Sequence, residues 1–281
     1  MRESYAQPPS PAVAAPLPWR LEDIDLSAVD AQRVRGDDTL FFMLASASFV
    51  EIASGLYTRN LSTYYSDDDA VVSWLNGNWE QEEIQHGRAL RAYVRAAWPE
   101  FDWDAANTAF YAEYSARCTL DEFEPTRGLE LAARCVVETA TATFYRMVHD
   151  YTDEPVLKTI TGHIKSDEVR HYSHFWRFFE QYRRREKVGR TKVLRAIVRR
   201  VVEVSNDDGL IAFRHAFATR YPQRRFERGH YDQFQRDLKR ILRGHYPFDM
   251  ALKMLLKPLN LPATLHSLVL PPLRKGARLL T

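Results

Sequence analysis

The stretch "IKSDEVRHYSHF" (residues 164–175) places Glu168 and His171 three positions apart, and "WEQEEIQHG" (residues 79–87) repeats that spacing with Glu83 and His86. Two residues three apart in an α-helix lie on the same face of that helix. One such pair is usually a solvated surface contact. Two copies in separate segments instead predict that both pairs belong to one site.

Both pairs lie in segments with the sequence features of long helices. Apolar residues recur at helical spacing over residues 37–65. "SDDD" (residues 66–69) supplies a cap for the next helix, which holds one of the pairs and ends before Pro99. Asp153 followed by Pro155 is typical of a helix start. The four expected helices cover residues 37–65, 66–98, 126–151 and 153–185, with a shorter helix at 104–118.

The other two long helices each contribute one glutamate in a small or apolar setting, namely Glu51 and Glu138. Strand-like alternation is not convincing anywhere, so we expect an all-α protein built on a four-helix bundle with additional C-terminal helices. The order along the chain is Glu, Glu-x-x-His, Glu, Glu-x-x-His, with one element in each helix.

This inventory is that of bundle sites for two iron or manganese ions. Four carboxylates balance the four positive charges of two divalent ions, whereas four buried glutamates without metal would repel one another. Oxygen ligands with two imidazoles suit iron or manganese better than ions that prefer thiolates. The predicted ligands are Glu51, Glu83, His86, Glu138, Glu168 and His171.

Other polar residues near these motifs do not follow the shared pattern. Glu80, Glu82 and Glu130 are interpreted as charges on helix surfaces. His174, one turn beyond His171, could be an extra ligand, a group that orients a ligand, or a plain polar residue.

Composition narrows the class of protein. Two cysteines among 281 residues are too few for a disulfide framework and fit a reducing cytosol. No apolar run reaches the length of a membrane span, and the N-terminus lacks the pattern of a secretory signal. We therefore expect a cytoplasmic protein without a membrane span.

Charge and proline divide the chain into three parts: a disordered proline-rich arm over 1–18, the bundle over 19–186, and a helical extension over 187–281. Residues 183–281 hold 23 Lys and Arg against 8 Asp and Glu, and the preceding part is acidic. The basic run at 182–200 could meet an acidic partner or be a solvated face, and no nucleic-acid recognition motif accompanies it. The apolar end could pack on the bundle, cover a channel, join a dimer or contact a membrane surface.

Residues 19–182 resemble the soluble ferritin-like acyl-carrier-protein desaturases. "WEQEEIQHGRALRAY" is similar to that family's Trp and Glu-Glu-x-x-His-Gly motif, "SDEVRH" to its Asp-Glu-x-x-His, and "DDTLFFMLASASFVE" to its first ligand helix. The resemblance implies a diiron site, two iron ions as cofactor and O2 as co-substrate. It also implies that Trp19, Asp167 and His86 form a hydrogen-bonded chain to one iron, and that Thr141 assists proton delivery.

The resemblance further implies an oxidoreductase of fatty acid metabolism and lipid biosynthesis that desaturates an acyl chain carried on acyl carrier protein. Its partners would be that carrier, a ferredoxin-type electron donor and a second copy in a homodimer. Two alternatives stay open. One is a diiron oxygenase that hydroxylates an aliphatic or amine substrate, and the other is a ferritin-like iron-binding protein without enzymatic activity.

Overall fold

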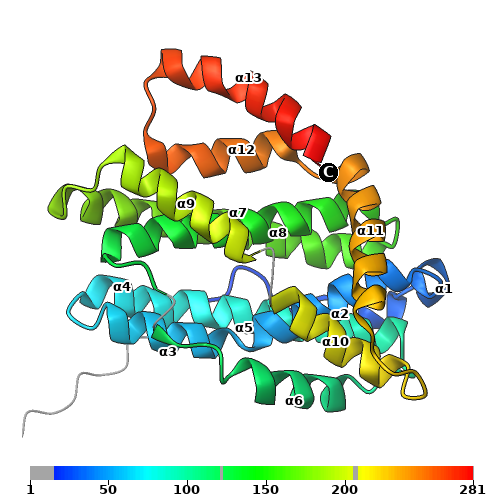
Figure 1. The fold of residues 1–281 in the computed structure, drawn as a ribbon. Helices are drawn as coiled ribbons and strands as arrows, with labels where there is room; N and C mark the ends of the chain where they lie inside the picture. The colour runs from blue at the N-terminus through cyan, green and yellow to red at the C-terminus, as the bar shows by residue number, and fades with distance from the viewer. Residues whose placement is uncertain (1–15, 121–122, 205–207, 281) are drawn as a thin grey trace, which may run out of the picture.

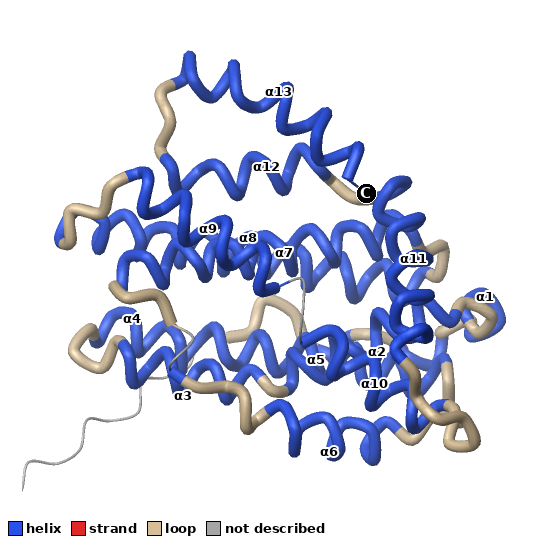
Figure 2. The backbone as a smooth tube through the Cα atoms, in the orientation of Figure 1, coloured by secondary structure: helices blue, strands red, loops and turns tan. Residues whose placement is uncertain are grey.

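The computed structural model describes residues 16–120, 123–204 and 208–280, and within these ranges helices and loops alternate without a strand (Figure 2). The prediction of an all-α protein is confirmed. Most of the proline-rich arm expected over 1–18 falls outside the described residues.

The first part of the chain folds into short α1 and the longer helices that follow it. These elements are α1 (Ala31–Val34), α2 (Asp38–Ile52), α3 (Ser54–Tyr64), α4 (Asp69–Trp74), a π-helical segment (Leu75–Trp79), α5 (Glu80–Ala97), α6 (Trp103–Tyr114), α7 (Arg127–Tyr151) and α8 (Pro155–Arg185). The extension adds α9 (Arg190–Val204), α10 (Asp208–Arg220), α11 (Arg228–His245), α12 (Phe248–Leu256) and α13 (Ala263–Leu280).

Two antiparallel helix pairs face each other (Figure 1). A three-residue connection turns α7 back as α8, so these helices form a hairpin. Helix α2 lies along α5 in the opposite direction, because Phe41 contacts Trp98 at one end and Glu51 lies beside Gly87 at the other. Helix α5 also packs against α8 and joins the two pairs.

Side-chain caps explain where the long helices begin. The Thr126 hydroxyl accepts a hydrogen bond from the Leu129 amide, and Glu154 accepts one from the Leu157 amide at 2.7 Å. Proline follows Glu154 directly, at a position where a missing amide hydrogen costs nothing. The cap of α8 is thus Glu154, one residue later than the predicted Asp153.

The predicted extents of three helices are wrong. The expected helix over 37–65 is broken at Ala53, whose amide shares the carbonyls of Phe49 and Val50 and tightens the turn after Glu51. The expected helix over 66–98 begins at Asp69 and is divided by the π-helical segment before Glu80. The helix expected at 104–118 ends at Tyr114.

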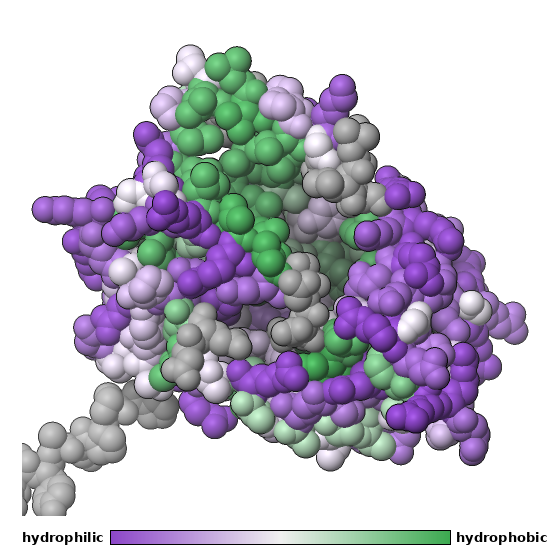
Figure 3. All heavy atoms as spheres, viewed as in Figure 1, coloured by the Kyte–Doolittle hydropathy of each residue, from purple (hydrophilic) through white to green (hydrophobic). Residues whose placement is uncertain are grey.

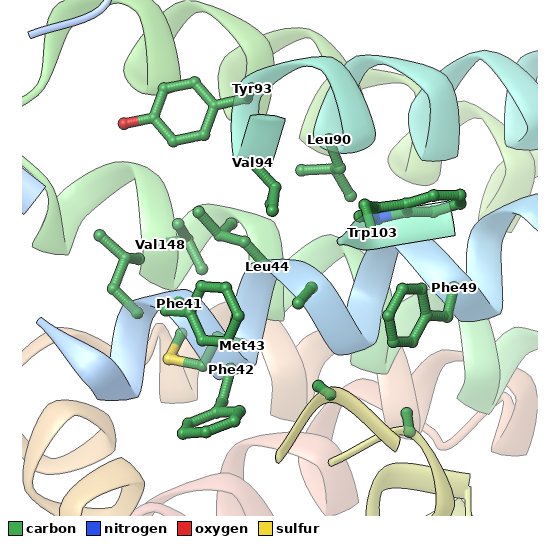
Figure 4. Close-up of a cluster of buried hydrophobic side chains, with 14 of the residues drawn as sticks. Phe41, Phe42, Met43, Leu44, Phe49, Leu90, Tyr93, Val94, Trp103 and Val148 are labelled. Atoms are coloured by element: carbon green, nitrogen blue, oxygen red, sulfur yellow. The ribbon is translucent and has the colours of Figure 1, made fainter. Parts of the chain in front are cut away.

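Apolar side chains form two clusters with a polar layer between them. In Figure 4, Phe41, Leu44 and Phe49 of α2 lie close to Leu90 of α5 and Trp103 of α6. The second cluster gathers residues of α3, α4, the π-helical segment, α7, α8 and α9. Along α8, Ile164 belongs to the first cluster and Phe175 to the second, so Glu168 and His171 lie between the two.

The C-terminal helices pack on this body. Helix α10 fills the angle between α6 and α2, α11 crosses α7 and α2, and α9 and α12 lie along α7 (Figure 1). Helix α13 packs on α12. Part of the basic run is neutralised by this packing, because Arg199 pairs with Glu124 and Arg200 with Glu130.

Among the described residues, one helical stretch, Asp38–Tyr64, is long and apolar enough to cross a membrane. Its most apolar window is 61% buried inside the protein, as in the core helix of a globular fold, and Glu51 lies within the stretch.

Candidate metal site

The structure brings all six predicted ligands together in the polar layer. They form two groups of four buried side chains, and in each group the ligand atoms lie within 4.8 Å of one another, so that each group could hold a metal ion. The first group is Glu51, Glu83, His86 and Glu168, and the second is Glu83, Glu138, Glu168 and His171. Glu83 and Glu168 belong to both groups, so two ions held there would be bridged by carboxylates.

Each long helix places its ligand through its packing. Gly87 lets α5 approach α2 closely, because a Cβ atom on Gly87 would lie 2.7 Å from the Ile52 nitrogen and 3.1 Å from the Glu51 Cβ. Real Cβ atoms essentially never show a contact of 2.7 Å. The glycine after His86 therefore brings the first glutamate and the first histidine to the same place.

Carboxylates from the opposite Glu-x-x-His helix fix the orientation of both imidazoles. His86 Nε2 lies 3.0 Å from Asp167 Oδ2, and His171 Nε2 lies 2.9 Å from Glu82 Oε2. Each of these acids directly precedes a ligand glutamate in its own helix. Held at Nε2, the two rings present Nδ1 to the centre of the site, as metal-binding histidines commonly do with their free nitrogen.

The histidine Nδ1 atoms and carboxylate oxygens that face the centre of the site could act as ligands to a cation. His86 Nδ1 lies 3.1 Å from Glu168 Oε1, and His171 Nδ1 lies 2.9 Å from Glu83 Oε1. Within the described part of the chain, both Nδ1 atoms are buried and have only these carboxylates beside them, without a hydrogen bond of regular geometry. The same holds for Glu138 Oε2 and Glu168 Oε1. Buried polar atoms are rarely left unpaired, so this arrangement fits a site built around bound cations.

The acid–base properties of the metal-free site point the same way. Burial and the neighbouring charges of Glu83 and Glu168 raise the pKa of Glu51 well above its usual value. Burial raises the pKa of Glu83 to about 7 and that of Glu138 to about 8. Burial opposes ionisation of Glu168, but the close imidazoles of His171 and His86 outweigh it and hold the pKa of this carboxyl well below its usual range.

The imidazoles retain protons in the same setting. Burial lowers the pKa of His86, but its hydrogen bond to Asp167 and its close contact with Glu168 outweigh burial and raise the pKa to about 9. Burial also lowers the pKa of His171, but its four neighbouring carboxylates outweigh burial and raise this pKa well above its usual value. Protons thus hold the carboxylates together when no metal is bound, and a bound cation would replace them.

Trp19, Asp167 and His86 are joined by hydrogen bonds. Trp19 Nε1 donates to Asp167 Oδ2 at 2.7 Å, and the same oxygen meets His86 Nε2. The Gln85 amide holds the Trp19 carbonyl, and the Trp19 ring stacks on His163 at 5.1 Å. The three side chains form a continuous chain of contacts that ends at His86. Trp19, at the other end of the chain, is 8% exposed.

Thr141 contacts one carboxylate oxygen of Glu168, and His86 lies beside the other. Its hydroxyl lies 2.6 Å from Glu168 Oε2, and its oxygen is also near the carbonyls of Val137 and Glu138. A hydroxyl that contacts a shared ligand can hand a proton to that carboxylate or take one from it. This position is compatible with the expected role in proton delivery.

Two further donors at the site are not among the predicted residues. The Tyr145 hydroxyl donates to Glu51 Oε1, and Trp79 Nε1 donates to Glu138 Oε1 at 3.2 Å. Both donors fix carboxylates that stand alone in their helices. Their sequence signal is weak, because an aromatic residue in a core helix is usually only a packing residue.

The interpretation of Glu82 and Glu130 as surface charges is wrong. Glu82 is 8% exposed and joins His171 to Arg170, whose guanidinium also reaches Asp167 at 2.6 Å. Glu130 is fully buried and pairs with Arg134 of its own helix and Arg200 of α9. The acid that precedes each Glu-x-x-His was the signal for Glu82, because the two motifs repeat at that position as well.

Glu80 and His174 lie outside the two ligand groups. Glu80 is only partly buried, and its carboxylate lies near Gly55, away from both ligand groups. His174 stacks on Trp74 at 4.9 Å and belongs to neither ligand group. Of the three interpretations of His174, that of an extra ligand is the one that this geometry does not support.

The site belongs to the class of buried carboxylate–imidazole clusters that can hold two neighbouring cations. Comparison of this chain with family models, with curated proteins and with solved structures gives no match.

Proposed function

We propose that this protein is a ferritin-like diiron oxidoreductase that uses O2 to desaturate an acyl chain carried on acyl carrier protein. The observation that carries the proposal is the pair of four-residue ligand groups that share Glu83 and Glu168. The order of their elements along α2, α5, α7 and α8 matches the inventory of carboxylate-bridged bundle sites.

The donor set supports iron as the metal. Four carboxylates and two imidazoles favour iron or manganese over softer ions, and four negative charges balance two divalent cations. Two ferrous ions bound there would supply electrons to O2 and the means to remove hydrogen from an unactivated carbon.

The chain's own residues would hold and protect this chemistry. Asp167 and Glu82 keep both imidazoles oriented, and the two apolar clusters on either side exclude water from the ligands. Thr141 would hold a proton at Glu168 Oε2 and pass it to the site.

Desaturation of an acyl chain with O2 needs two electrons from outside. The contacts from Trp19 through Asp167 to His86 offer a path for them, and a ferredoxin-type protein would dock near Trp19. An acidic acyl carrier would meet the cationic extension, since residues 183–281 carry 23 basic and 8 acidic side chains. Small residues would leave room for the acyl chain. They lie on the ligand helices α2 and α7 (Ala45, Ser46, Ala140 and Ala142) and at the break before α3 and its start (Ala53, Ser54 and Gly55).

The experiment that tests this function starts from the reduced, iron-loaded protein. It is mixed with a panel of acyl carriers under O2, and the acyl products are analysed by mass spectrometry. Loss of two hydrogens supports desaturation, gain of one oxygen assigns hydroxylation, and unchanged acyl chains contradict both activities. Glu168→Ala is the matched inactive control, because it removes a ligand that both groups share.

A further inference from the structure

Large apolar side chains are exposed on two helices of the C-terminal extension, α9 and α13. On α13, Leu265 is 43%, Leu268 71% and Leu273 40% exposed. On α9, Leu194 and Val198, one turn apart, are 47% and 54% exposed. Burying such side chains is favourable, so their exposure marks a surface that contacts something else.

These residues lie on the outer side of the molecule. Helix α13 packs on α12, and α12 lies on α7, so α13 forms the outermost layer at this end of the structure (Figure 1). The space-filling view shows apolar residues gathered over α12 and α13 and continuing toward α9 (Figure 3). We call the exposed residues of α9 and α13 named above the apolar face.

Exposed cationic side chains lie on α9 and α13, the helices that carry the apolar face, and on α12. The segment from α12 to α13 (Phe248–Leu280) contains five Lys and Arg residues and one acid, Asp249, which pairs with Arg274 at 2.5 Å. Lys253 and Lys275 are exposed on the same two helices. On α9, Lys192 and Arg195 are exposed next to Leu194.

Charge decides between the possible occupants of this face. A second copy would bring another strongly cationic extension against the first, which like-charge repulsion opposes. An acidic carrier protein would satisfy the cations but would leave the leucines to pack against a charged surface. A bilayer with anionic headgroups satisfies both, because leucines enter the headgroup boundary while lysines and arginines meet the lipid phosphates.

We infer that the apolar face docks the protein on the surface of an anionic lipid bilayer, with α13 lying in the interface. The inference does not depend on the metal site, because the ligands lie on α2, α5, α7 and α8. If the proposed desaturase activity is also correct, docking would bring the enzyme to the membranes whose lipids are built from the unsaturated acyl chains.

Vesicle flotation with the full-length protein tests this inference. One set of vesicles is pure phosphatidylcholine, and the other contains about 30% phosphatidylglycerol. We expect the protein to float with the anionic vesicles, to stay behind with the neutral ones, and to dissociate as salt is raised. Absence of flotation, or equal flotation with both lipids, overturns the inference.

Matched variants locate the contact. Leu265→Glu with Leu268→Glu should abolish flotation, and Lys253→Glu with Lys275→Glu should weaken it roughly tenfold or more. Leu120→Glu is the control, because Leu120 is 42% exposed outside the face. Wild-type metal content in the double leucine variant would show that it is folded and would separate this result from that of the metal site. If the leucine variant changes only self-association or retention of an acidic carrier, and vesicle binding is unaffected, the inference is wrong.

Discussion

Asp167 Oδ2 lies 3.0 Å from His86 Nε2, and the two residues belong to different helices of the site. Glu82 stands in the same relation to His171 at 2.9 Å. The repeat of the two motifs thus extends beyond the ligands to the residues that orient them. Each Glu-x-x-His helix carries an acid that serves the histidine of the other helix.

This exchange predicts matched losses of metal affinity. Asp167→Ala and Glu82→Ala should each weaken metal binding by roughly 10- to 100-fold, because each leaves one imidazole without its partner. Titration of the metal-free protein with Fe2+ under anaerobic conditions measures the effect. Glu130→Gln is the control, because it removes a buried carboxylate that lies outside both ligand groups. If Glu82→Ala binds metal as the wild type does, the proposed symmetry has no functional meaning.

Gly87 offers a test of the helix approach. Gly87→Ala should lower the free energy of unfolding by about 1–3 kcal/mol, because the added Cβ meets the Ile52 backbone. Gly244 lies exposed in α11 with nothing within 4 Å of an added Cβ, so Gly244→Ala should raise stability by up to about 1 kcal/mol. Chemical denaturation of the two variants compares them directly. If the two substitutions changed the free energy of unfolding by the same amount, the close approach of α2 and α5 at Gly87 would contribute nothing to stability.

Trp19→Phe should slow the transfer of electrons to the metal site without changing metal binding. The phenyl ring can keep the stacking on His163, but it cannot donate to Asp167. We expect a normal metal content together with slower reduction of the ferric protein by an external donor, followed by stopped-flow absorbance. A rate equal to that of the wild type would remove Trp19 from the electron path.

The protonation of the metal-free site predicts how its stability changes with pH. The pKa of His86 rises from 6.5 to about 9 on folding, and those of Glu83 and Glu138 rise from 4.5 to about 7 and about 8. Folding therefore takes up protons, and the stability they contribute is full below the unfolded pKa values and is lost as pH rises through the folded ones.

Thermal unfolding of chelator-treated protein should show a melting temperature that falls between about pH 6.5 and about pH 9. Metal-loaded protein should be less affected, because the cation replaces the protons and binds more tightly as they leave. A flat or rising curve for the metal-free protein would contradict this account of the site.

The sequence was enough to predict which six side chains come together and the approximate extent of the long helices, because both depend on short-range patterns. The helix start at Thr126, the proline in the first turn at Pro155 and the repeat of Glu-x-x-His are readable within a few residues. The break at Ala53 and the π-helical segment before Glu80 were not predicted, because neither contains proline and both depend on the packing of α3 and α5.

The buried charges were missed for a different reason. Glu130 is neutralised partly by Arg200, which follows 70 positions later, and Glu82 by His171, 89 positions later. A sequence read in short windows treats such acids as surface residues, because an unpaired carboxylate is rarely buried. Only the folded chain shows that each has a partner.

Metal stoichiometry tests the central claim most directly. Elemental analysis of the purified, iron-reconstituted protein should give two iron ions per chain, and Glu168→Ala should lose at least one of them, because Glu168 belongs to both ligand groups. Circular dichroism should confirm that the variant keeps its helices. A folded wild-type protein that binds no iron, or a Glu168→Ala variant that keeps both ions, would contradict the account.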